Sequence, residues 1–513
     1  MNDNPEITGL EALYFAAIDS DVELITAVAG FPITAVAEKF IREKGTGKHR
    51  IHWITNEKSA LETALGASVT GQRSLVLVKH VGMNVLADPL MTSVLHTTGA
   101  GLVIFAGDDP AATASQNEQD SRWYGKISEL TVFDPATPED AYKCVKRAFE
   151  LSEEAKVPVI VRVTDRIQKS ESSFERKIKK NGSVVKNEFD RSIWKFTMHG
   201  KHQRFHQRSY PLLVSESETS PLNRTTGTGK DIGVISSGYP SAVVDELISS
   251  NPEFSGTSNL TLNVVSPFPF EMVRKFLRNY RHVLVIEESE DFIESHLRIL
   301  GNIRGKASGH VPVGLVGKEH IEFALKNIDK DTVTKYTDIQ TIKARGPRSV
   351  CDRCPYMSLY NVLRELDVMV AGDMGCSIRT APEPLGAVDT GFALGGAIST
   401  ACGFKNKGIA VIGDFGLAHS GIVGLINAVN CNFDVLVIVL DNKVAAMTGG
   451  QETPEILEMV RTLVPDMTIF DIDESLSVKG MQGTRDELEE KISSRLMSKG
   501  VSVLYVKGKC ILY

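Results

Sequence analysis

A carboxylate and an amide in the last third of the chain have the types and spacing of a metal–diphosphate site. Residues 409–450 read IAVIGDFGLAHSGIVGLINAVNCNFDVLVIVLDNKVAAMTGG, so that Asp414 ends one apolar run and Asn442 follows a second run 28 positions later. Magnesium takes oxygen ligands and commonly needs only one or two side chains when phosphates fill its other positions. Gly413 and Gly416 beside the aspartate would admit a phosphate. The alternative is an ordinary strand-end aspartate and a turn asparagine.

Two strands joined by a helix would bring these two side chains together. Both apolar runs have the length and branched aliphatic content of parallel strands, and residues 419–428 between them have helical spacing. In open parallel α/β sheets, ligands bind at the carboxyl ends of the strands. The pattern therefore predicts that Asp414 and Asn442 lie side by side at one sheet edge.

A second carboxylate of interest is Glu57, which follows Thr55-Asn56 at a predicted strand-to-helix junction. Considered alone, an acid in the first turn of a helix is explained by the helix dipole. The surrounding residues alternate between strand and helix patterns, which predicts an open α/β layer. The predicted strands are 23–29, 50–54, 74–79, 101–106 and 158–163, and the predicted helices are 33–43, 57–70 and 138–155.

Polar residues follow several of these strands and could contact a polar substrate. The candidates are Thr34, His80, Asn84, Asn117 and Arg122. Thr34 follows Pro32, and capping of the next helix is the favoured role for its hydroxyl. A lone histidine such as His80 is more often structural than catalytic. For a substrate carboxylate, an arginine or a histidine would be the natural contact.

Four cysteines have a spacing that could hold a metal centre. Cys351 and Cys354 form a CxxC pair, Cys376 follows a strand end, and Cys510 follows the last predicted strand, 501–506. The pair alone could be a redox dithiol, half a zinc site or half an iron–sulfur site. Four thiolates could hold one [4Fe-4S] cluster or one zinc ion. The other three cysteines, Cys144, Cys402 and Cys431, are expected to be buried.

Size and composition limit the possible classes of protein. A chain of 513 residues has room for three or four domains, and its net charge of −7 argues against a general nucleic-acid binder. No apolar stretch is long enough to cross a bilayer and no signal region opens the chain, so we expect a cytoplasmic location without membrane contact. Seven cysteines in such a chain argue against a disulfide framework.

The middle of the chain contains two further kinds of segment. Residues 169–208 carry eleven Lys or Arg against four Asp or Glu, which could bind an acidic partner or nucleic acid, but an extended linker lying over acidic domains is favoured. Residues 229–325 form another α/β pattern, with strands at 231–236, 260–264 and 282–286 and helices at 240–249 and 268–278. Glu287, Glu288 and Glu290 follow the third of these strands and could be catalytic, but no partner residues accompany them, so the start of a solvated helix is favoured.

The order of these motifs resembles one group of thiamine-diphosphate enzymes. Their metal motif begins with Gly-Asp and ends with Asn after a helix and a strand, as at Asp414 and Asn442. Residues 446–451, AMTGGQ, resemble the 2-oxoacid:ferredoxin oxidoreductase family. The first half resembles the large (alpha) subunits of its indolepyruvate branch. The residues that carry this resemblance are Asn56-Glu57-Lys58, Lys79 to Gly82, Ala87 to Met91 and Ser115 to Asp120.

The resemblance implies a multidomain α/β chain. Its parts would be a pyrimidine-binding domain at 1–168, a basic linker at 169–228, a transketolase C-terminal-like domain at 229–325, a connection at 326–348 and a diphosphate-binding domain at 349–513. It implies that Glu57 hydrogen-bonds the aminopyrimidine ring and activates the thiazolium carbon. Asp414, Asn442 and the carbonyl of Val444 would hold magnesium, with Gly413, Gly416, Met447 and Thr448 around the cofactor. The four spaced cysteines, Cys351, Cys354, Cys376 and Cys510, would hold a [4Fe-4S] cluster.

The function implied is oxidative decarboxylation of a 2-oxoacid, with an aryl pyruvate such as indolepyruvate as the substrate and acyl-coenzyme A as the product. The family also implies a homodimer of this chain, a small beta subunit and ferredoxin as electron acceptor. The chain ends at Tyr513 without the ferredoxin-like CxxCxxCxxxCP segment of that subunit, so electrons would pass to a partner's clusters or to a docking ferredoxin. The alternatives are a non-redox decarboxylase of the sulfopyruvate or phosphonopyruvate type and an inactive cofactor-binding scaffold.

Overall fold

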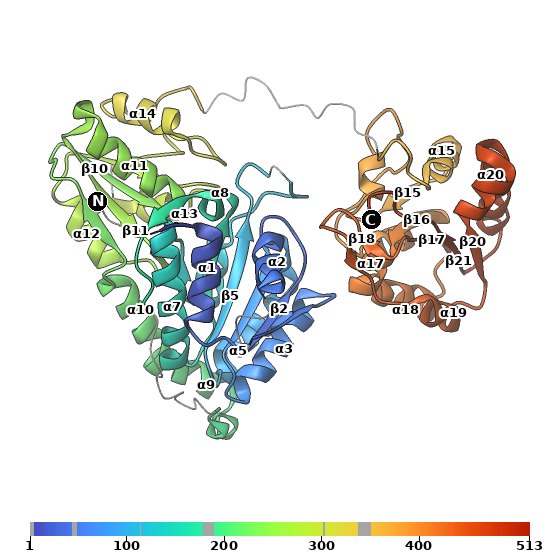
Figure 1. Cartoon of the computed structure of the whole chain (residues 1–513), viewed down its shortest axis with the longest axis horizontal. Coiled ribbons are helices and arrows are strands. Elements are labelled where there is room, and N and C mark those ends of the chain that lie inside the picture. The colour runs from blue at the N-terminus through green and yellow to red at the C-terminus, as the bar shows by residue number, and fades with distance from the viewer. Residues whose placement is uncertain (1–4, 44–48, 113, 178–188, 301–302, 337–349) are drawn as a thin grey trace. The chain divides into compact units, whose positions relative to one another are not determined.

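The computed structural model describes residues 5–43, 49–112, 114–177, 189–300, 303–336 and 350–513. The chain divides into two compact units, Met1–Thr341 and Ile342–Tyr513, and each is described by itself (Figure 1). Within the described residues, no helix has both the length and the apolar character needed to cross a membrane.

The first unit is built around a seven-stranded sheet in the order β12-β6-β7-β5-β4-β2-β3. All neighbouring pairs are parallel except β12 with β6. The strands are β2 Leu24–Ala27, β3 Arg50–Trp53, β4 Ser74–Lys79, β5 Leu102–Asp108, β6 Val132–Phe133, β7 Val159–Thr164 and β12 Val264–Ser266. The central strand β5 is buried along its whole length, as expected for a parallel strand with both faces covered.

Helices cover both faces of this sheet, and the predicted alternation of strands and helices is confirmed. The helices are α1 Gly9–Ile18, α2 Thr34–Arg42, α3 Glu57–Val69, α4 His80–Val85, α5 Ala87–His96, α6 Arg122–Ser128, α7 Pro138–Ala155 and α8 Asp165–Lys169. A short antiparallel pair, β1 Glu6–Thr8 with β8 Glu171–Ser173, joins the start of the unit to the end of this layer.

A second sheet of the same unit has the order β14-β13-β10-β11-β9. Its strands are β9 Arg224–Thr226, β10 Ile232–Ser237, β11 Thr257–Leu262, β13 His282–Ile286 and β14 Ile303–Arg304. Its helices are α11 Tyr239–Ser250, α12 Phe270–Leu277, α13 Phe292–Leu297 and α14 Lys318–Lys326. Since β12 leaves this layer to pair with β6, the two layers of the unit are joined by backbone hydrogen bonds.

The basic segment is not an extended linker where the structure describes it. Residues 191–219 form consecutive helical turns, and residues 178–188 of the predicted linker lie outside the described part. The elements are η1 Arg191–Lys195, α9 Met198–Arg204, the π-helical turn η2 Phe205–Ser209 and α10 Tyr210–Thr219. Trp194 contacts the ring of His96 at 4.8 Å between centroids, and the Lys201 ammonium lies 3.9 Å from the Trp194 ring centre. An extended linker was therefore the wrong prediction, because aromatic anchors fold this segment onto α5.

Glu287 and Glu288 are buried, contrary to the predicted solvated helix start. Both side chains are about 1% exposed, and burial raises the pKa of each carboxyl. Arg122, itself fully buried, lies 2.8 Å from Glu287 and also pairs with Asp120. Arg166 pairs with Glu288. These ion pairs join the seven-stranded layer to the second layer, which local sequence patterns could not indicate.

Removing one member of this buried network is expected to destabilise the first unit strongly. Arg122→Met should lower the free energy of unfolding by about 3–5 kcal/mol, because it leaves the buried carboxylates Asp120 and Glu287 without their partner. Arg274→Met, which removes only an exposed pair with Glu271, is the control and should change little. Denaturant unfolding of the two variants measures the difference, and equal stability would contradict the role given to Arg122.

The second unit contains a five-stranded parallel sheet in the order β15-β16-β17-β21-β20. The strands are β15 Val370–Gly372, β16 Gly408–Gly413, β17 Val435–Asp441, β20 Met467–Asp471 and β21 Val501–Lys507, and β18 Val444–Ala445 pairs with β19 Gln451–Glu452. The helical elements are α15 Met357–Glu365, η5 Ser377–Thr380, α16 Ala397–Cys402, α17 Asp414–Gly416, η6 Leu417–Gly421, α18 Ile422–Asn430, α19 Leu457–Leu463 and α20 Ile472–Leu496. The predicted strand–helix–strand unit is confirmed, because β16 and β17 are adjacent and parallel.

Candidate cofactor site

Asp414 and Asn442 lie at the carboxyl ends of the neighbouring strands β16 and β17, as predicted. Asp414 Oδ2 accepts hydrogen bonds from the Lys443 backbone N–H at 2.7 Å and from the Thr453 hydroxyl at 2.9 Å. Asn442 Oδ1 accepts one from the Val444 N–H at 3.1 Å. Burial raises the pKa of Asp414 to about 6, with Asp441 adding to the shift. The turn after β17 is therefore held directly against the carboxylate.

Two glycines beside Asp414 have different surroundings. A Cβ on Gly416 would lie 1.8 Å from Asp373 Oδ2, so no larger residue fits there. A Cβ on Gly413 would meet no atom within 4 Å, and the backbone there, with φ −75° and ψ 158°, suits any residue. Gly416 is therefore required by the fold, whereas Gly413 faces open space at the strand end.

The hairpin after Asn442 carries the remaining residues predicted around the cofactor. Val444 begins β18, and Met447 is 54% exposed in the turn that follows. Thr448 donates its hydroxyl to Gln451 Oε1 at 2.8 Å, and Gln451 donates its amide to the Thr448 carbonyl at 3.0 Å. These bonds give the turn a defined shape.

Glu57 is the first residue of α3 and is only 6% exposed. Asn56 caps the helix by accepting a hydrogen bond from the Lys58 N–H at 2.9 Å. The carboxylate lies against α4 at Gly82, where a Cβ would be 2.7 Å from Glu57 Oε1. Lys58 pairs with Asp88 and Glu62 at the surface. Gly82 thus gives the space that lets a carboxylate be buried at this strand-to-helix junction.

Four cysteine thiols of the second unit gather close enough to affect one another electrostatically. Burial raises the pKa of Cys354 to about 12, and Cys376, Cys351 and Cys510 each add to that shift. Burial also raises the pKa of Cys376, with further contributions from Cys510 and Cys351. The structure therefore places the distant Cys510 within electrostatic range of Cys354 and Cys376.

A buried tyrosine hydroxyl lies beside these thiols. Tyr360 is fully buried in α15, and its pKa is raised by burial and by the nearby Cys354 and Cys376. Its hydroxyl has no hydrogen-bond partner among the described residues. A buried unpaired hydroxyl is costly, so a group with acceptor atoms would be favoured at this position.

Of the remaining cysteines, Cys144 is buried as expected, but Cys431 is exposed and Cys402 is partly exposed. The prediction of burial was therefore wrong for Cys431. This residue ends α18, beyond the apolar face of the helix.

Comparison with known proteins matches a segment of each unit to a family that binds thiamine diphosphate. Residues 373–506 match the family described as "Thiamine pyrophosphate enzyme, C-terminal TPP binding domain". Residues 21–207 match "Pyruvate flavodoxin/ferredoxin oxidoreductase, thiamine diP-bdg". The indolepyruvate oxidoreductase subunit IorA of Archaeoglobus fulgidus is 29% identical over 87% of this chain and 76% of its own. The chain is therefore an IorA-like subunit of a thiamine-diphosphate-dependent oxidoreductase.

Other relatives agree with this assignment to an IorA-like oxidoreductase subunit. Subunit IorA of Methanothermobacter thermautotrophicus is 29% identical over 99% of this chain and 87% of its own. A solved 2-oxoglutarate:ferredoxin oxidoreductase from Magnetococcus marinus, with 2-oxoglutarate, coenzyme A and succinyl-CoA bound, has a TM-score of 0.53 at 16% identity. It covers 64% of this chain and 66% of that one, and the likeness confirms the fold. The two family matches support thiamine diphosphate as the cofactor of this oxidoreductase.

Gly413 and Gly416 provide a matched test of where the diphosphate of the cofactor binds. Gly413→Ala should keep the melting temperature, because its methyl group enters open space. It should weaken thiamine diphosphate binding by about tenfold or more, or ~1.4 kcal/mol, because the methyl group would occupy the space that suits a phosphate. Gly416→Ala should destabilise the second unit by about 1–3 kcal/mol, because its methyl group overlaps Asp373. Calorimetric titration and thermal unfolding separate the two effects, and unchanged binding by Gly413→Ala would exclude Gly413 from the cofactor site.

Three of the predicted substrate residues form one hydrogen-bonded group. The His80 ring is buried, with Nδ1 3.2 Å from the Gly107 carbonyl and Nε2 3.2 Å from Asn117 Oδ1. Gln119, which sequence reasoning missed, donates to the His80 carbonyl at 2.7 Å and accepts from the Asn84 amide at 3.0 Å. His80 therefore positions the loop that carries Asn117, in line with the structural role favoured for a lone histidine.

Two other predicted residues have different roles from those expected. Thr34 is the first residue of α2 rather than its cap, and its hydroxyl accepts a hydrogen bond from the Gly30 N–H at 2.8 Å. Arg122 is fully buried and pairs with Asp120 and Glu287, so its guanidinium is not accessible to a substrate. The prediction of Arg122 as a substrate contact fails because the second layer covers it.

Asp373 is a buried carboxylate beside Gly416 that the sequence reasoning did not single out. Its Oδ1 accepts a hydrogen bond from the Gly395 N–H at 2.6 Å, and burial raises its pKa to about 6. Gly395 has a positive φ of 80°, and a Cβ there would lie 2.1 Å from Ser420 Oγ. The signal was present in the sequence, because Gly372-Asp373 follows β15 as Gly413-Asp414 follows β16.

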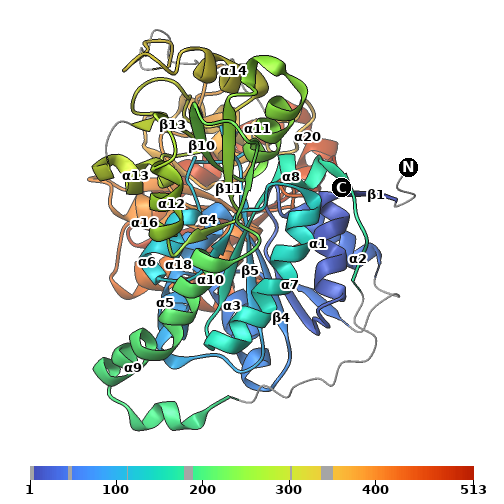
Figure 2. The same cartoon turned by 90° about the vertical axis from the view of Figure 1, so that its left-hand side faces the viewer.

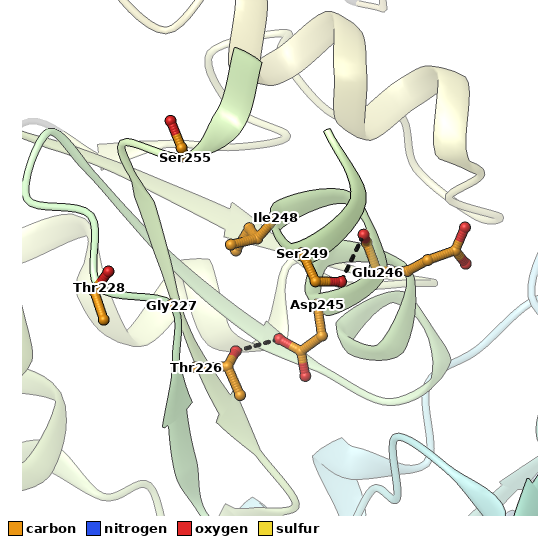
Figure 3. A pocket seen from close by; sticks show the side chains of 8 residues that line it. All are labelled: Thr226, Gly227, Thr228, Asp245, Glu246, Ile248, Ser249 and Ser255. Carbon is orange, nitrogen blue, oxygen red and sulfur yellow. Dashed lines mark hydrogen bonds between the residues drawn. The ribbon is translucent and has the colours of Figure 1, made fainter. Parts of the chain in front are cut away.

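A surface hollow of about 580 Å³ lies apart from these residues, between β9 and α11 (Figure 3). Its lining includes Thr226, Asp245 and Glu246. Asp245 already accepts hydrogen bonds from the Thr226 hydroxyl and from the Asn259 amide, the latter at 2.8 Å. None of the predicted site residues lines this hollow.

Proposed function

We propose that this oxidoreductase subunit decarboxylates a 2-oxoacid oxidatively, with an aryl pyruvate such as indolepyruvate as substrate and an acyl-coenzyme A as product. The main support is the buried Glu57 carboxylate, held at a strand-to-helix junction in the segment that matches the thiamine-binding family model. The names of the IorA relatives support the substrate class.

We infer that Asp414, Asn442 and the Val444 carbonyl hold Mg²⁺ on the cofactor's diphosphate. An ionised carboxylate has about four acceptor positions, and Asp414 uses three of them for Phe415, Lys443 and Thr453. A coordination position therefore remains. The open space at Gly413 suits a phosphate, and Met447 and Thr448 would lie beside the cofactor.

Glu57 would hydrogen-bond the aminopyrimidine ring and move the proton that activates the cofactor. The support is its position, because Glu57 begins α3 and its side chain is only 6% exposed. When bound, thiamine diphosphate supplies the carbon nucleophile and the electron sink for decarboxylation. Thr34, His80, Asn84 and Asn117 are proposed to line or support the substrate pocket.

Cys351, Cys354, Cys376 and Cys510 are proposed ligands of a [4Fe-4S] cluster. Four thiolates are the usual ligand set, and the unpaired Tyr360 hydroxyl beside Cys354 and Cys376 could donate a hydrogen bond to a cluster sulfur. Electrons would leave through this cluster to ferredoxin or a partner subunit. A small beta subunit and a second copy of this chain are the proposed partners.

Anaerobic purification followed by a panel of 2-oxoacids tests the proposal. We expect a brown protein whose visible absorbance bleaches with an aryl pyruvate and coenzyme A, and which then reduces an artificial one-electron acceptor. A colourless protein that binds thiamine diphosphate and releases an aldehyde without an acceptor would instead indicate non-redox decarboxylation. Cofactor binding without turnover of any 2-oxoacid would indicate a scaffold subunit.

A further inference from the structure

Two histidines and a glutamate meet at the surface of the first unit, outside the residues used above. His202 lies in α9, His206 in η2, and Glu129 ends α6. One potential ligand atom of each residue lies within 4.8 Å of those of the other two. Figure 2 shows α9 at one end of the view and α10 nearby. None of these three residues has a part in the thiamine chemistry proposed above.

The geometry of this cluster suits a transition-metal ion. His206 Nε2 is 3.2 Å from Glu129 Oε2, and the rings of His202 and His206 are 4.6 Å apart between centroids. Tetrahedral zinc with bonds of about 2.0–2.1 Å places its ligand atoms roughly 3.3 Å apart. The histidine–glutamate pair already has this separation, and a ligand atom of His202 lies within 4.8 Å of both.

The backbone around the cluster is held in place by neighbouring contacts. Histidines four positions apart lie on one face of a helix, and the widened turn η2 begins between these two. Phe205, which is buried, anchors the turn, and Lys201 on α9 lies over the Trp194 ring. Glu129 has a left-handed backbone with φ 58°, and its N–H bonds the Gly125 carbonyl. The ligand atoms therefore project from an ordered scaffold.

The ion pair between His206 and Glu129 would not by itself explain why the three side chains gather. His206 and Glu129 are both more than a third exposed, and exposed pairs contribute little stability. Two imidazoles and one carboxylate suit zinc, and three protein ligands leave a fourth position for water. We propose that Glu129, His202 and His206 bind one Zn²⁺ ion, which fastens the α9–α10 helical segment to the turn between α6 and β6.

The test uses the full-length chain carrying Cys351→Ser and Cys354→Ser, so that the thiols do not compete for metal. After chelator treatment, titration with Co²⁺ should give one equivalent of binding, with visible d–d bands, no sulfur charge-transfer band and displacement by Zn²⁺. His202→Ala and His206→Ala should each weaken binding by about tenfold or more. Zn²⁺ should also raise the melting temperature of the parent but not of these variants.

Two further variants keep the test decisive. His199→Ala removes an exposed histidine of the same helix that is not in the cluster, and it should bind Co²⁺ as the parent does. Glu129→Gln keeps the shape of the side chain and should still weaken binding. Melting temperatures measured in chelator establish that each variant folds. Absence of Co²⁺ and Zn²⁺ binding by the parent, or equal binding by His199→Ala and both cluster variants, would overturn the proposal.

Discussion

Glu57→Gln is expected to lower the turnover of a 2-oxoacid by about 10²–10⁴-fold while folding and thiamine diphosphate affinity stay close to those of the parent. Glutamine has nearly the same shape, so it fits the buried position beside Gly82. Its amide cannot exchange a proton as the carboxylate can. Steady-state turnover, calorimetric cofactor titration and the exchange rate of the thiazolium proton measure the three properties.

Glu62→Gln is the matched control for Glu57, because Glu62 lies on the same helix α3 but is exposed. It should leave turnover unchanged. Gly82→Ala is an independent test, since its methyl group would lie 2.7 Å from Glu57 Oε1 and displace the carboxylate. This variant should also lose turnover. Equal activities of Glu57→Gln and Glu62→Gln would remove Glu57 from the mechanism.

Cys354→Ser is expected to abolish 2-oxoacid-dependent reduction of an electron acceptor. Cys354 lies within electrostatic range of the other three proposed ligands. Because a [4Fe-4S] cluster is held by four thiolates, loss of this thiol should remove the cluster that the four would share. The visible absorbance and the iron content of anaerobically purified protein should fall together. Thiamine diphosphate binding should persist, because the proposed diphosphate ligands Asp414 and Asn442 do not include this thiol.

The exposed Cys431 provides the control for this variant. Cys431→Ser should keep the colour, the iron content and the electron transfer of the parent. If Cys354→Ser kept all three as well, the group of four cysteines would not hold a cluster. If it lost them but still released an aldehyde from the 2-oxoacid, the chemistry on the thiamine side would be separable from electron transfer.

Local patterns in the sequence were sufficient to predict the sheets and to place Asp414 and Asn442 at the ends of neighbouring strands. The apolar runs before Asp414 and Asn442 predicted two parallel strands, and β16 and β17 are adjacent in the structure. The position of Glu57 at a strand-to-helix junction was also predicted, and this residue is the first of α3 in the structure. These predictions succeed because strand periodicity and parallel crossover connections determine which residues reach the carboxyl edge of a sheet.

The sequence by itself therefore determined the parallel layers and the residues at their carboxyl ends. Only the tertiary structure decided that Arg122 and Glu287 are buried together, that Trp194 folds the basic segment onto α5, and that Cys510 lies within electrostatic range of Cys354. The physical reason is the range of the interactions. Periodicity reflects contacts between near neighbours in the chain, whereas the burial of a charge or the gathering of thiols depends on elements more than a hundred residues away.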